Sequence, residues 1–135
     1  MVREIAVVAG LMAAVPAVAG EMTASDARHF VIGKLFIYTC FDGTHGQSRV
    51  HADGSVVGSI QSQGGEPVRY AALPAGTLRV EGERVCASLR GLQIQPCFNL
   101  DRTDANSFRG SILGLSLAYC DFTRTSRNTA PNIPQ

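Results

Sequence analysis

Short runs of alternating apolar and polar residues make up most of the chain, and turn signals separate them. A period of two with β-branched and aromatic residues is typical of strands. Asp-Gly at 53–54 and Pro-Ala-Gly at 74–76 are two of the turn signals between the runs. The pattern predicts strands at residues 35–41, 48–52, 55–61, 67–73, 77–80, 85–90, 97–102, 108–113 and 116–123.

A helical period precedes the first of these strands. Residues 21–33 predict a short helix, with Thr23 or Ser25 as its cap and Gly33 at its end. No crossover helix is visible between the strands that follow, which excludes a parallel sheet. We therefore expect an all-β, mainly antiparallel domain with a short N-terminal helix, built as a small barrel or sandwich of about eight or nine strands.

The first 19 residues have the pattern of a cleavable export signal. Arg3 is basic, residues 5–18 carry no charge, and Ala17-Val18-Ala19 fits the small-residue cleavage rule. The apolar run is shorter than the about 20 residues that a spanning helix needs, so a membrane anchor is the weaker alternative. We predict a bacterial periplasmic or secreted protein, cleaved after Ala19 or Gly20, with no transmembrane segment in the mature chain.

These patterns divide the chain into four parts. Residues 1–19 are the predicted signal peptide, and residues 20–33 the helical lead-in. Residues 34–123 form the predicted β domain. Residues 124–135 are polar and rich in proline, with no period, and predict a disordered tail.

The four cysteines all lie in the predicted β domain, and an exported chain meets an oxidising compartment. Spacing alone leaves three pairings open. Cys86 and Cys97 each lie on the strand face opposite their apolar neighbours, so a hairpin around Gly91 would place them together. We therefore favour Cys86–Cys97 and, by elimination, Cys40–Cys120. Zinc is the weaker alternative, because ten residues separate the closest pair and zinc sites usually contain C-x2-4-C.

Charge and motifs exclude several functions. The formal net charge is +1, from 12 basic and 11 acidic residues, so the chain lacks the basic excess of a nucleic-acid-binding protein. No nucleophile elbow, phosphate loop or calcium loop occurs, and we expect no cofactor and no resident metal. Gly58 and Gly110 fall inside predicted strands, where glycine marks a bulge or bend.

The densest group of side chains that could perform chemistry contains two histidines and two aspartates. His45 or His51 with Asp42 or Asp53 could bind a metal or transfer protons. Each aspartate precedes a glycine, however, and Asp-Gly is ordinary turn chemistry. A second group consists of three tyrosines and an arginine: Tyr38, Arg69, Tyr70 and Tyr119. These side chains could line a barrel mouth, present a contact surface or simply fill the core.

Seven short segments carry a family resemblance. They are GKLF at 33–36, CFDGT at 40–44, DGSV at 53–56, LPAGTLRV at 73–80, CASL at 86–89, PCFN at 96–99 and YCDF at 119–122. In these segments the chain resembles small exported alphaproteobacterial proteins that have no assigned activity. The resemblance implies a β-rich periplasmic domain and supplies no catalytic residues.

Three functional hypotheses follow from the sequence. The first is a non-enzymatic binding module for a small ligand, an envelope component or another protein. The second is an inhibitor of a secreted protease that acts through residues 20–27 or through the tail. The third is an enzyme that uses His45 or His51 with Asp42 or Asp53.

Overall fold

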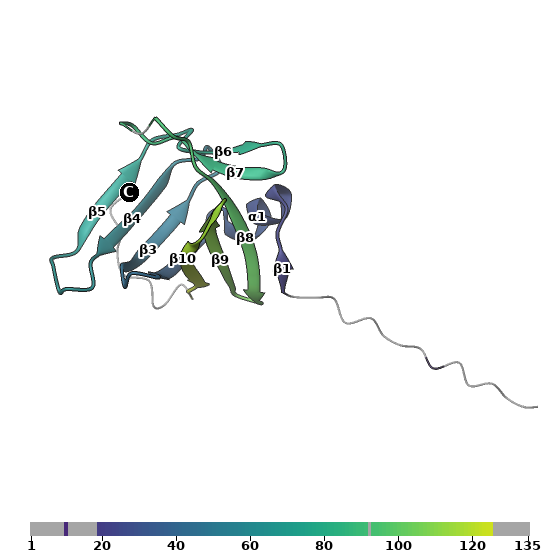
Figure 1. The fold of residues 1–135 in the computed structure, drawn as a ribbon, viewed down its shortest axis with the longest axis horizontal. Helices are drawn as coiled ribbons and strands as arrows, with labels where there is room; N and C mark the ends of the chain where they lie inside the picture. Colours follow the sequence, from purple (N-terminus) through teal and green to yellow (C-terminus); the bar gives the residue numbers. More distant parts are fainter. Residues whose placement is uncertain (1–9, 11–18, 92, 126–135) are drawn as a thin grey trace, which may run out of the picture.

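The computed structural model describes residue 10, residues 19–91 and residues 93–125. The predicted signal peptide, apart from residues 10 and 19, and residues 126–135 of the predicted tail lie outside the described residues. The described chain forms one curled antiparallel sheet and one short helix (Figure 1). Its elements are β1 Gly20–Glu21, α1 Ala24–Val31, β2 Leu35–Cys40, β3 His45–Val50, β4 Val56–Gln61, β5 Arg69–Leu73, β6 Leu78–Glu81, β7 Arg84–Ala87, β8 Cys97–Asp104, β9 Ser107–Ile112 and β10 Leu115–Arg124.

The sheet consists of two meanders joined at its centre. Its strand order is β5-β4-β3-β2-β10-β9-β8-β7-β6, and the short β1 pairs with β8. The joint is the antiparallel pair β2–β10, in which Cys40 lies directly opposite Cys120. The prediction of a mainly antiparallel β domain with one short helix is confirmed. The first and last strands of the predicted domain are neighbours.

The sheet curls into a half-barrel and does not close. Among the described residues, no strand pairs with the outer edges of β5 and β6. Eight antiparallel pairs join these nine strands, so β5 and β6 run in the same direction and closure would require a parallel pair. A parallel pair needs a connection of about a dozen residues, but only residues 74–77 link β5 to β6. The expected small barrel or sandwich is therefore, in the described chain, a half-barrel that stays open.

Glycines allow β3 and β4 to approach each other closely inside the curl. A Cβ atom at Gly46 would collide with the carbonyl oxygen of Ser59, and one at Gly58 with that of Gln47. Tyr38 lies opposite Gly46 in the β2–β3 pair, and its hydroxyl donates to the Ser59 carbonyl across 2.7 Å. Glycine at these two positions therefore permits the close approach, and the Tyr38 hydroxyl lies beside the space where a Gly46 side chain would be.

Two turns are hydrogen-bonded to each other at one end of the sheet. The Gly76 amide donates to the Asp53 carbonyl (2.8 Å), and the Leu78 amide donates to the Gly54 carbonyl (3.0 Å). Gly54 has a φ of +83°, and a Cβ there would collide with the Leu78 carbonyl. This contact fixes the start of β6. In Figure 1 the β6–β7 hairpin lies across the upper end of the half-barrel.

Helix α1 packs on the concave side of the sheet. Thr23 caps it, accepting from the Asp26 amide while the Asp26 carboxylate accepts from the Thr23 amide. Phe30 projects from the helix onto Phe36 of β2 and Phe108 of β9, at centroid distances of 5.8 and 6.0 Å. The helix is shorter than expected, because residues 20–21 pair with β8 and the Met22 amide donates to the Leu100 carbonyl.

Candidate functional site

A cavity of about 800 Å³ lies between the concave face of the half-barrel and α1. Residues of the concave face line it because strand side chains alternate between the two faces. Most are aliphatic or aromatic, and they include Val50, Val56, Leu78, Val85, Leu100 and Ile112. Small-molecule sites typically have volumes of about 300–1,000 Å³ and mostly apolar walls. This cavity matches both properties.

The two unpaired sheet edges give the cavity an opening. Leu73 of β5 and Val80 of β6 both line it. Val80 is 51% exposed and Leu73 is 37% exposed, so solvent reaches the apolar wall at both edges. The cavity wall is therefore interrupted between β5 and β6, which no backbone ladder joins.

A few polar groups interrupt the apolar wall. The Tyr38 hydroxyl already donates to a backbone carbonyl, and burial raises the pKa of Tyr38 above its ordinary value. Ser48 of β3 and Arg28 of α1 also line the cavity, as do the charged or titratable side chains of Asp42, His51, Asp53 and Arg79. Tyr119 also lines the wall, while Tyr70 does not and is 60% exposed. Small-molecule sites commonly combine a mostly apolar wall with a small number of polar groups.

The two disulfides lie on opposite faces of the sheet. Cys40–Cys120 joins β2 to β10, and both of its cysteines line the cavity. Cys86–Cys97 joins β7 to β8, and Val85, Ala87 and Phe98 beside it line the cavity instead. These are the two predicted pairs, Cys86–Cys97 from strand parity and Cys40–Cys120 by elimination. Glu81 lies close to Cys86 and Cys97, but sulfurs bonded to each other offer no thiolate to a metal.

The histidines and aspartates singled out above lie at the two ends of β3. Asp42 lies in the β2–β3 turn and His45 is the first residue of β3, whereas His51 and Asp53 lie in the β3–β4 turn. The six residues of β3 stand between the two turns, a length of about 20 Å. The two pairs are therefore apart along the strand, although Asp42, His51 and Asp53 all line the wall of the cavity and His45 does not.

Each aspartate carboxylate accepts hydrogen bonds from residues of its own turn. The Thr44 amide donates to Asp42 (3.0 Å), and this bond lowers the pKa of Asp42. The Ser55 hydroxyl and amide donate to Asp53, at 2.6 and 2.9 Å, and they lower its pKa. A carboxylate held in its ionised form by its own turn is a poor proton acceptor.

Residues 20–27 lie within the fold. Gly20 and Glu21 pair with β8, Met22 is buried in the core, and the next residues form α1. A protease inhibitor that used this segment as an extended strand would have to release it from the core. This placement favours the cavity over the N-terminal segment as the functional feature.

The sequence predicted the apolar strand faces that line the cavity, but it did not predict that a cavity lies between them. The period of two identified Val85, Ala87 and Leu89 as one apolar face, and all three line the cavity. Whether such a face is packed or open depends on how far the sheet curls and on what fills it. No signal in the chain reports that directly.

The comparisons with known proteins give no family for this fold. No family model, no curated protein and no solved structure matches the chain. Among the described residues, no helix is long and apolar enough to cross a bilayer. The class of protein is therefore defined by the structure alone: a disulfide-linked antiparallel half-barrel with an apolar concave face.

Proposed function

We propose that this chain is an exported, non-enzymatic binding protein whose half-barrel holds a small, largely apolar ligand. The observation that carries the proposal is the cavity of about 800 Å³ with its apolar wall. Water in such a cavity makes few hydrogen bonds, so an apolar ligand that displaces it gains free energy in proportion to the area covered. The export part rests on the signal pattern, and two disulfides are expected in an oxidising compartment.

A fluorescence titration tests the binding. The apolar probe N-phenyl-1-naphthylamine brightens in an apolar site, and we expect saturable binding to the purified protein. Ser48→Trp places a large side chain in the middle of the cavity, and Val80→Trp places one at its opening. Each should weaken probe binding by roughly tenfold or more, because each occupies volume that the probe needs.

A matched variant separates blocking from the mere presence of tryptophan. Thr39→Trp adds the same side chain to β2, at an exposed position that does not line the cavity. It should leave binding unchanged. Val80 is half exposed, so its variant tests the site even if Ser48→Trp disturbs folding. Equal probe affinity in all four proteins would refute the cavity as the binding site.

A further inference from the structure

Three leucines are exposed to solvent at the β9–β10 turn and the start of β10. Leu113 is 44% exposed, Leu115 is 60% exposed and Leu117 is 84% exposed. The pairing of β9 with β10 shifts between Leu115 and Tyr119, so residues 116–118 bulge out of the ladder. We call residues 113–117 the leucine tip. Burying each leucine would gain free energy, and so many large apolar side chains on one tip mark an interaction surface.

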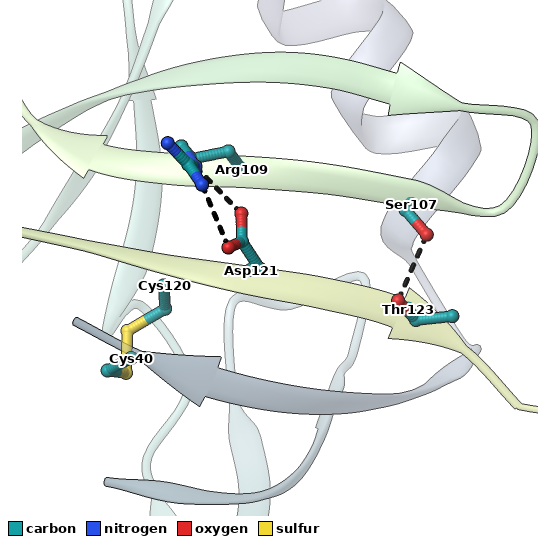
Figure 2. A network of polar contacts seen from close by, with 6 residues as sticks. All are labelled: Cys40, Ser107, Arg109, Cys120, Asp121 and Thr123. Carbon is teal, nitrogen blue, oxygen red and sulfur yellow. Dashed lines mark hydrogen bonds and ion pairs between the residues drawn. A yellow bond between two sulfur atoms is a disulfide. The ribbon is translucent and has the colours of Figure 1, made fainter. Parts of the chain in front are cut away.

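Polarity rises in steps along the hairpin away from this tip. Residues 110–120 contain no charge. Tyr119 and Phe41 come next, with ring centroids 6.1 Å apart. Arg109 lies over the Tyr119 ring at 3.9 Å and binds Asp121 through two hydrogen bonds of 2.7 and 3.0 Å. Figure 2 shows this ion pair and, further along the same two strands, the Ser107–Thr123 hydroxyl pair.

Apolar, aromatic and charged side chains follow one another along the hairpin in the order of the layers of a lipid bilayer surface, from acyl chains to headgroups. Leu115 pairs with Ile112 and Asp121 with Arg109, so the ion pair lies three ladder positions, about 10 Å, from the start of β10, and Tyr119 lies between them. Apolar side chains of surface-bound proteins enter a bilayer by about 5–10 Å, and aromatic rings lie at the headgroups. Arg109 and Asp121 neutralise each other and are both about half exposed, and the Arg109 N–H groups outside this pair can donate to a lipid phosphate.

We propose that the leucine tip docks this protein on a zwitterionic phospholipid surface. Ile112 and Ala118 stand at the base of the tip and line the cavity, so the docked protein holds one end of its apolar cavity against the membrane. The docking stands independently of ligand binding. It would, however, give an apolar ligand a route between bilayer and cavity.

Flotation with phosphatidylcholine vesicles tests the docking. The protein is purified after export and processing, and mass spectrometry establishes its N-terminus, which all variants share. We expect the natural protein to float with the vesicles and Leu115→Ser/Leu117→Ser to bind roughly a hundredfold more weakly, since two buried leucines are lost. Val68→Ser/Tyr70→Ser removes two exposed apolar side chains elsewhere and should still float.

Three outcomes would overturn the docking: no flotation of the natural protein, equal flotation of the tip variant, or loss of flotation in both double variants. If the tip variant instead loses self-association in analytical ultracentrifugation, the tip contacts a second copy. Neither leucine lines the cavity, so the tip variant should keep its affinity for the naphthylamine probe. Loss of docking with intact probe binding, or the reverse, separates the two proposals.

Discussion

At the residue scale, the carboxylates in the turns couple stability to pH. Folding lowers the pKa of Asp53 below its ordinary value of 3.8, chiefly through the Ser55 hydroxyl and then through the Ser55 amide. The ionised form is therefore favoured by folding. This contribution to stability is complete above the ordinary pKa and is lost as the pH falls through the lowered pKa.

Asp53→Ala should therefore lower the melting temperature at pH 7 and matter progressively less below pH 4. Melting curves from pH 2 to pH 7 measure the difference from the natural protein at each pH. Ser55→Ala removes the larger of the two causes and should reproduce part of the effect. A difference that stays constant across this range would show that the lowered pKa contributes nothing to the stability of the turn.

Single residues also show how much the sequence predicts. Asp53 and Gly54 form the expected turn, because Asp-Gly favours one backbone shape in any context. The same chemistry lowers the pKa of both Asp42 and Asp53. The contact of this turn with Gly76 and Leu78 joins residues more than twenty positions apart, and local preferences say nothing about such contacts.

At the scale of elements, the close approach of β3 and β4 depends on the absence of side chains at two positions. Gly46→Ala should destabilise the protein by about 2–4 kcal/mol, because the new Cβ would collide with the backbone of β4 and the strands must separate. Urea unfolding measures the loss. Gly64→Ala is the matched control, since nothing lies within 4 Å of its added Cβ, and it should change stability by less than about 0.5 kcal/mol.

Similar costs for the two substitutions would mean that β3 and β4 can separate freely. The prediction of a bend at glycines inside strands anticipated this geometry at Gly58. It did not anticipate Gly46, which lay in an expected loop and is part of β3. The boundary moved because β3 pairs along its full length with both β2 and β4, and pairing outweighs weak strand propensity.

At the scale of the whole molecule, the number of strands decides whether the sheet can close. Alternation identified the strands and their faces, and the cysteines indicated that β2 and β10 are neighbours. An odd number of strands with a four-residue β5–β6 connection leaves the sheet open. That outcome depends on counting every strand correctly, and an error of one strand reverses it. The open edge and the cavity behind it were therefore beyond local sequence patterns.

The central disulfide should contribute more to stability than the peripheral one. Cys40–Cys120 joins residues 80 positions apart and connects the two meanders, whereas Cys86–Cys97 closes a separation of 11 within one hairpin. The chain-entropy model gives about 4.5 kcal/mol for the long loop and about 3 kcal/mol for the short one. Urea unfolding of Cys40→Ala/Cys120→Ala and of Cys86→Ala/Cys97→Ala should therefore show the larger loss for the first pair. Cys86 is fully buried, so a larger loss for the second pair would show that packing around this sulfur outweighs the entropy of the unfolded chain.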